Sequence, residues 1–222
     1  WSSDVCSSDL DAKGEIGRAV EGIEFAVNAP QVTKGEFAAN VGGDIDVFSI
    51  RVPIGVVGAI TPFNFPIMVP AVMMTMAVSV GNAIVWKPSE KVPSTALIFA
   101  RLWKEAGLPD GVFNIVQGDK EMVDGILEHP GIAGVSFVGS TAVGEYVYQK
   151  GTSHNKRVAA FTGGKNHMVV MPDADLESAA SAFVSAGFGS ASQRCMAVSL
   201  LLPVGQDTAD RRLTPLGASV GL

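Results

Sequence analysis

Residues 54–90, IGVVGAITPFNFPIMVPAVMMTMAVSVGNAIVWKPSE, contain the pattern that decides the fold. The continuous apolar run 54–60 predicts a buried strand, and the apolar segment 67–80 is long enough for a helix. A second apolar run at 83–86 predicts another buried strand, which ends at KPSE. Strand, helix and strand in this order are typical of a right-handed βαβ unit with two parallel strands.

The same alternation continues on both sides of this unit. Further helices are expected at 11–27, 93–106, 120–127 and 142–149, and further strands at 112–116 and 135–138. Residues 44–55 (DIDVFSIRVPIG) alternate as in an antiparallel strand. Short apolar strands between helices predict an α/β fold, in which helices cover both faces of a parallel sheet.

Ligands of such a sheet bind at the carboxyl ends of its strands. The segments TPFNFP (61–66), KPSE (87–90) and GST (139–141) each follow a predicted strand, so we expect them at one edge of the sheet.

The pattern changes after Lys156. Residues 157–171 are predicted to be extended, with a break at Gly163 and Gly164, and a helix then begins near Asp173 or Asp175. This helix leads into a loop of small residues that contains a cysteine, Cys195. We therefore expect one domain at 11–160, truncated at its N-terminal side, and the start of a second α/β domain at 161–211, so that the chain is a fragment.

The two ends of the chain differ from the rest. Residues 1–10, WSSDVCSSDL, have low complexity and no periodicity, and we interpret them as a foreign remnant. Residues 212–222 are interpreted as a divergent tail. Excluding Cys6 leaves Cys195 as the only native thiol, which fits a reducing, cytoplasmic compartment.

Composition excludes several classes of function. The 222 residues are 47% hydrophobic and carry a formal net charge of −6, which argues against a nucleic-acid surface or a polybasic membrane anchor. The longest nearly apolar run, 67–80, is too short to span a membrane. One native cysteine and three scattered histidines show no ligand spacing, so no metal site is expected.

The segment GSASQRCMAV (189–198) allows two interpretations. The neighbouring Arg194 favours the thiolate of Cys195, and the small residues before it allow a substrate to approach, as a nucleophile requires. The alternative is a buried apolar thiol, the commonest state of a free cysteine.

Each strand-end segment also has two interpretations. Asn64, held between prolines, could donate hydrogen bonds to an oxyanion or cap the next helix. Lys87 and Glu90 could hold a ribose or form a solvated charged loop. Ser140 could help to bind a phosphate at a helix start or be an ordinary N-cap, and neither a P-loop nor G-x-G-x-x-G is present there.

Taken together and in this order, the segments resemble the aldehyde dehydrogenase superfamily, and within it the CoA-acylating methylmalonate/malonate semialdehyde dehydrogenases. The resemblance covers residues 11–211. The matching motifs are PFNFP, KPSE, EAGLPDGVFNIV, VSFVGST, KNHMVVMPDADL and GSASQRCMA.

The resemblance implies a cofactor and a set of site residues. It assigns the nucleophile to Cys195 and the oxyanion donors to the Asn64 side chain and the Cys195 backbone N–H. It implies an NAD-binding domain at 11–160, with a variant Rossmann fold, and a catalytic domain that starts at 161–211. The NAD-binding residues that it implies are Thr61, Phe63, Lys87, Glu90, Lys91, Ser140 and Thr162.

One departure from the family bears on how the acyl group is released. Hydrolytic members have a glutamate two residues before the glycine pair, whereas this chain reads FTGGK with Phe161 at that position. Without a base there, attack by water on a thioester is poorly assisted, and the thiol of coenzyme A could act instead. The implied reaction is NAD-dependent oxidation of (methyl)malonate semialdehyde to propionyl-CoA or acetyl-CoA, with loss of CO2. The alternatives are a CoA-independent hydrolytic semialdehyde dehydrogenase and a noncatalytic dinucleotide-binding module.

A carboxylate on the substrate calls for cations in the site. Arg194 lies beside the nucleophile in sequence and Arg18 matches a family arginine, so both are candidates to bind this carboxylate. Their alternative roles are a helix-surface charge and a structural salt bridge. The family further implies a homo-oligomer, a dimer or tetramer, and we expect the fragment to be inactive by itself.

Overall fold

The computed structural model describes residues 9–211 of the chain. The predicted tail at 212–222 and residues 1–8 of the predicted remnant, with Cys6, lie outside the described residues. The chain divides into two compact units. The sheet unit is Gly14–Thr162, and the thiol unit begins at Gly163 and also includes the start of the first helix through Lys13. The predicted domain bounds, 11–160 and 161–211, stay a prediction.

The sheet unit contains a parallel five-stranded sheet in the order β5-β4-β3-β6-β7. Its strands are β3 (Val56–Ile60), β4 (Ala83–Lys87), β5 (Phe113–Ile115), β6 (Ile132–Val138) and β7 (Arg157–Phe161). All neighbouring strands run parallel. The chain winds outward from β3 in one direction through β4 and β5 and in the other through β6 and β7. This confirms the predicted α/β fold and sets a topological switch between β3 and β6.

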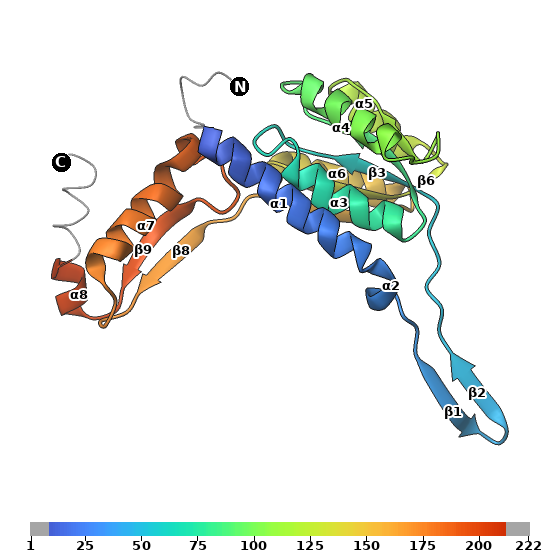
Figure 1. Cartoon of the computed structure of the whole chain (residues 1–222), viewed down its shortest axis with the longest axis horizontal. Helices are drawn as coiled ribbons and strands as arrows, with labels where there is room; N and C mark the ends of the chain where they lie inside the picture. Colours follow the sequence, from blue (N-terminus) through green and yellow to red (C-terminus); the bar gives the residue numbers. More distant parts are fainter. Residues whose placement is uncertain (1–8, 212–222) are drawn as a thin grey trace. The chain divides into compact units, whose positions relative to one another are not determined.

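Helices cover both faces of this sheet (Figure 1). They are α1 (Asp9–Val27), α3 (Met68–Ser79), α4 (Pro93–Glu105), α5 (Lys120–Glu128) and α6 (Thr141–Ser153), with a short α2 (Ala29–Val32) after α1. Ala59 of β3 packs in a core cluster with α1, α3 and α4, whereas the next residue, Ile60, packs in the cluster with α5 and α6. Both faces of β3 are therefore buried, which is why its sequence is a continuous apolar run.

A hairpin extends away from the sheet of its unit (Figure 1). It consists of β1 (Phe37–Gly42) and β2 (Ile45–Phe48), which pair antiparallel. The alternation at 44–55 predicted β2, but its partner β1 was not predicted. Every residue of the two strands is exposed, among them Phe37 at 67% and Phe48 at 68%. An isolated two-stranded hairpin is at best marginally stable in water.

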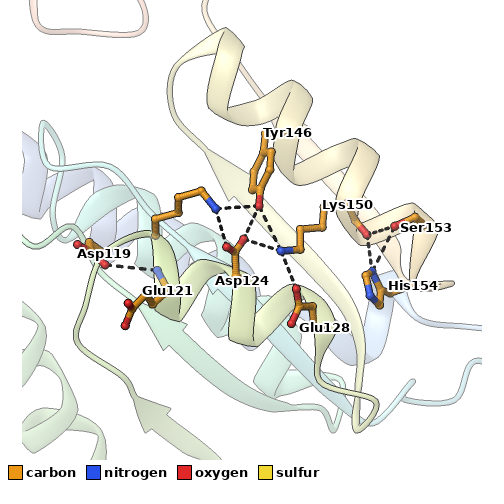
Figure 2. Close-up of polar contacts among 9 residues, drawn as sticks. Asp119, Glu121, Asp124, Glu128, Tyr146, Lys150, Ser153 and His154 are labelled. Carbon is orange, nitrogen blue, oxygen red and sulfur yellow. Dashed lines mark hydrogen bonds and ion pairs between the residues drawn. The ribbon is translucent and has the colours of Figure 1, made fainter.

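A polar cluster joins α5 to α6 (Figure 2). Tyr146 on α6 donates its hydroxyl proton to Asp124 on α5 at 2.6 Å. Lys150 pairs with Asp124 at 2.9 Å and with Glu128 at 2.6 Å, and Lys120 pairs with Asp124 at 2.6 Å. Hydrogen bonds from Lys120, then Tyr146 and Lys150, hold the pKa of Asp124 well below its usual range. The cluster therefore links α6 to α5, and the N-cap residue of α6, Ser140, is a predicted cofactor contact.

Asp124→Asn is expected to lower the free energy of unfolding by about 1–2 kcal/mol, because it removes the charge that three donors share. Since the folded-state pKa of Asp124 is lowered, its contribution is complete well above the unfolded-state pKa of about 3.9 and is lost as the pH falls below it. Urea unfolding at pH 7, followed by tryptophan fluorescence, measures the difference.

Asp110→Asn is the matched control. Asp110 pairs with Lys104 at 3.6 Å, and their side chains are 90% and 76% exposed. An exposed pair of this kind contributes less than about 0.5 kcal/mol. Equal losses in the two variants would show that the cluster does not stabilise the unit.

The thiol unit contains two parallel strands, β8 (Asn166–Val170) and β9 (Val198–Pro203). Between them are helix α7 (Leu176–Phe188) and the 3-10 turn η1 (Gly189–Ser192), and α8 (Gln206–Arg211) follows β9. Of the two predicted cap residues, Asp175 is the N-cap of α7, because its carboxylate accepts from the N–H groups of Glu177 and Ser178. Strand β9 was not predicted. No helix within residues 9–211 combines the length and the apolar character that crossing a membrane requires.

Candidate functional site

The loop after β3 is bonded to the end of β4. The Thr61 N–H donates to the Lys87 carbonyl at 3.2 Å, and the Trp86 indole N–H donates to the Thr61 hydroxyl at 2.9 Å. All three residues are buried. The side chain of Thr61, a predicted NAD contact, thus holds the loop in place.

The structure brings the two predicted ribose residues together. The Lys87 side chain is only 7% exposed, and its Nζ atom lies 2.9 Å from the Glu90 carboxylate, which is half-exposed. The hydrogen bond from Lys87 lowers the pKa of Glu90, so this carboxylate stays ionised. Glu90 therefore offers a hydrogen-bond acceptor at the surface, next to the ammonium group of the buried Lys87.

Lys91 and Phe63 also meet at this edge. The Lys91 ammonium lies 4.5 Å from the centroid of the Phe63 ring. This cation–π contact links the loop after β3 to the loop after β4. Both residues are predicted cofactor contacts, and both are accessible to solvent in part.

The segment with Asn64 is held by a residue that the sequence analysis missed. The Glu15 carboxylate of α1 accepts from the N–H groups of Ile67 and Met68 at 2.7 and 3.0 Å. It thereby satisfies two unpaired donors at the start of α3. No sequence signal marks this contact, because more than 50 residues separate the partners. Asn64 is half-buried in the turn before α3, and its role as an oxyanion donor stays a prediction.

Ser140 is the N-cap of α6 and is exposed. Its side chain makes no capping hydrogen bond to the helix, and the first helical bond runs from the Gly144 N–H to the Ser140 carbonyl. The three amides between these residues have no partner within the helix and can bind an anion.

Thr162, the residue directly after β7, lies close to α6. A Cβ atom at Gly144 would collide with the Thr162 methyl group, so the close approach requires a glycine there. A buried cation paired with an exposed carboxylate, together with open amides at a helix start, fits the hydroxyls and phosphates of a dinucleotide such as NAD. The predicted NAD contacts themselves stay predictions.

Cys195 in the thiol unit is a free and exposed cysteine. It lines a cavity of ≈ 400 Å³ together with Gly164, Asn166, Phe183 and Phe188, among other residues. The Asn166 side-chain amide donates to the carbonyls of Cys195 and Ala197 at 2.8 and 3.0 Å, which ties the Cys195 loop to β8. Exposure to a cavity disagrees with the alternative of a buried thiol.

The turn before Cys195 has an uncommon backbone. Ser190, Ala191 and Ser192 have φ angles of 51°, 50° and 61°, although none of them is glycine. Each residue in the left-handed region costs of the order of 1 kcal/mol or more, and such strain is concentrated at functional sites.

The two predicted substrate arginines each pair with a carboxylate of the chain. Arg194 lies 2.6 Å from Asp11, and Arg18 lies 2.9 Å from Glu21. The Arg18 side chain is 71% exposed, as expected of a helix-surface charge. These contacts favour the alternative roles, and binding of a substrate carboxylate stays a prediction for both. Among residues 9–211, no group of three or more His, Cys, Asp and Glu side chains is arranged to hold a metal ion.

Comparison with known proteins identifies a family whose members resemble this chain over most of its length. The model of the aldehyde dehydrogenase family matches residues 2–220. A malonate-semialdehyde dehydrogenase of Pseudomonas aeruginosa is 52% identical over 206 residues, which are 93% of this chain and 41% of that protein. The corresponding enzyme of Lacticaseibacillus casei is 53% identical over 86% of this chain and 39% of its own length. The chain thus spans about two fifths of the length of the curated relatives that it matches.

Solved structures agree with this result. A Sinorhizobium meliloti protein assigned as a methylmalonate-semialdehyde dehydrogenase, solved in complex with NAD, superposes with a TM-score of 0.92. It is 50% identical, and the match covers 97% of this chain and 44% of that one. The methylmalonate-semialdehyde dehydrogenase of Oceanimonas doudoroffii gives a TM-score of 0.91 at 48% identity, over 96% of this chain and 43% of that one.

Proposed function

The chain belongs to the aldehyde dehydrogenase family, and from this premise we propose that the protein oxidises malonate or methylmalonate semialdehyde with NAD and passes the acyl group to coenzyme A. The observation that carries the proposal is Cys195, an exposed thiol that lines a cavity and follows a strained turn. The names of the relatives support the substrate class.

The proposed chemistry starts at the sulfur atom of Cys195. Its thiolate adds to the aldehyde carbon, and the Asn64 amide and the Cys195 backbone N–H are the donors that the family resemblance assigns to the resulting oxyanion. NAD, when bound, supplies the acceptor for the hydride that leaves this adduct. The product on the chain is a thioester of Cys195. Loss of CO2 from the acyl group and attack by the thiol of coenzyme A then give acetyl-CoA or propionyl-CoA and regenerate the cysteine.

The sheet unit would bind the cofactor at the carboxyl ends of its strands. Lys87 and Glu90 would hold ribose hydroxyls, because they offer a fixed donor and an ionised acceptor 2.9 Å apart. The amides at the start of α6, next to Ser140, would bind the pyrophosphate. The other NAD-binding residues of the proposal are Thr61, Phe63, Lys91 and Thr162, as the family resemblance implies.

Phe161 supports coenzyme A, rather than water, as the acyl acceptor. It is the last residue of β7 and is 60% exposed, so this position presents a ring where hydrolytic members have a carboxylate. A phenyl ring cannot accept a proton from water, so hydrolysis of the thioester lacks a general base at this position. A thiol is a better nucleophile toward a thioester than water is.

Product analysis tests the proposal in a polypeptide as long as the curated relatives. We expect acetyl-CoA or propionyl-CoA and one CO2 per NADH, and little turnover without coenzyme A. Phe161→Glu is the matched variant and is expected to raise the formation of free acid without coenzyme A. Free acid formed equally fast by the unsubstituted protein without coenzyme A would reject acyl transfer and favour the hydrolytic enzyme.

We also propose that the protein is a cytoplasmic homo-oligomer, a dimer or a tetramer. The exposed thiol supports a reducing compartment. The β1–β2 ribbon, which exposes Phe37, Val47 and Phe48, supports association, because a partner surface would bury these side chains. A monomeric mass in sedimentation equilibrium of the longer polypeptide would contradict the oligomer.

A further inference from the structure

Asp11 makes two hydrogen bonds that join the start of α1 to the loop before Cys195. Its Oδ2 atom accepts from the Ser190 hydroxyl at 2.8 Å, and its Oδ1 atom accepts from the Arg194 guanidinium at 2.6 Å. All three residues belong to the thiol unit. The Arg194 and Asp11 side chains are shielded from water in part, and a charge-assisted bond is worth more there than at an exposed site.

The two bonded residues bracket the strained turn. Ser190 is the first of three consecutive residues with left-handed backbone, and Arg194 follows the last of them after one residue. The Arg194 guanidinium also folds back over Gly189, where a Cβ atom would come 2.6 Å from its Nη1 atom. Left-handed conformations of serine and alanine persist only where the surroundings hold them. Asp11, Gly189 and Arg194 supply this support.

We propose that Asp11 is a positioning residue for Cys195: one carboxylate holds both ends of the turn, and the turn holds the thiol at the cavity. The inference rests on the proposed function only in that it takes the positioned thiol to be the nucleophile.

The charge state of Asp11 is consistent with this role. The hydrogen bond from Ser190, and then the contacts with Arg194, lower the pKa of Asp11 although burial opposes them. The carboxylate is therefore ionised at neutral pH and can accept from both partners at once.

Hydrogen exchange of the 222-residue chain tests the proposal without any activity assay. Two amides report on the turn: the Gln193 N–H, bonded to the Ser190 carbonyl, and the Ala197 N–H, bonded to the Arg194 carbonyl. The Val204 N–H, bonded to the Val170 carbonyl beside the β8–β9 pair, is the reference within the same unit. In Asp11→Asn we expect the first two amides to exchange about tenfold faster, because a charged hydrogen bond is lost. The exchange rate of Val204 should not change.

Asp173→Asn is the matched control, because Asp173 is an exposed carboxylate of the same unit. It should leave all three amides unchanged. Unaltered exchange at Gln193 and Ala197 in Asp11→Asn would overturn the proposal. So would an equal increase at all three amides, since that pattern reports a loss of global stability.

A second variant covers the case in which Asp11→Asn does not fold. Ser190→Ala removes only one of the two bonds to Asp11 and should raise exchange at Gln193 more than at Val204. No selective increase in Ser190→Ala would also overturn the proposal. The proposed function fails in a different measurement, namely if the Cys195→Ser variant keeps full activity. That result would not alter the exchange rates of the Gln193, Ala197 and Val204 amides.

Discussion

Cys195→Ser is expected to lower the rate of NADH formation by at least about 10³-fold, because a serine hydroxyl is almost entirely protonated at neutral pH and adds poorly to an aldehyde. The loss should appear in kcat, since the substitution alters a single atom and leaves the cavity around it intact. The assay is the absorbance of NADH at saturating aldehyde, in a polypeptide as long as the curated relatives.

Cys6→Ser removes the other cysteine of the 222-residue chain, so that labelling of this variant reports on Cys195 alone. Iodoacetamide labelling of the 222-residue chain in a Cys6→Ser background gives a second measurement that needs no turnover. Labelling of Cys195 at the rate of a model thiol, with full NADH formation in Cys195→Ser, would instead support a noncatalytic thiol.

Lys87→Met is expected to weaken the binding of NAD by about 10- to 100-fold, because a charged hydrogen bond to the ligand and the alignment of Glu90 are lost together. Methionine is a suitable replacement, since residue 87 is buried at the end of β4 and an unbranched apolar chain can fill the same space. Calorimetric titration of the 222-residue chain with NAD measures the dissociation constant.

Lys104→Met controls for the change in net charge. Lys104 is an exposed residue in the last turn of α4, and its substitution should leave the NAD affinity unaltered. Equal affinities of the Lys87→Met variant and the unsubstituted chain would show that Lys87 is a structural residue only. Circular dichroism of both variants would establish that the sheet unit is folded.

Most of the sheet unit could be predicted from the sequence, for a physical reason. Strands of a parallel sheet are buried on both faces, so the sequences of β3 and β4 are apolar runs. Segments that contain Gly, Pro and charged residues separate these runs from the neighbouring elements. The predicted strand at 54–60 begins at Val56 in the structure, and the predicted helix at 67–80 is α3, Met68–Ser79. Strand β9 was not predicted, because its apolar run VSLLLP follows the Cys195 loop without a break.

The local part of the candidate site was also predictable. Lys87 and Glu90 are three residues apart at a strand end, so their contact needs little beyond the turn between them. The order of motifs identified the family, and the family model matches residues 2–220. The place of Phe161 in the motif FTGGK alone showed that it stands where hydrolytic members of the family have a glutamate.

The contacts that hold the site together could not be predicted in this way. Glu15 reaches the start of α3 across 52 residues, and Asp11 reaches Arg194 across 183. Lys156 is 6% exposed and donates to the carbonyls of His129 and Ile132, although a lysine in a polar segment is normally solvated. Each pairing depends on the approach of elements that are distant in the chain.

The amino-acid sequence alone therefore determined the fold class, the order of strands and helices, and the residue types at the strand ends and in the Cys195 loop, because periodicity and motif spacing are local properties. Only the tertiary structure decided which carboxylate neutralises which cation, that the Cys195 thiol is exposed, and that the turn before it is strained. These properties follow from packing, which brings a donor and an acceptor within 3 Å only after the helices and strands have docked.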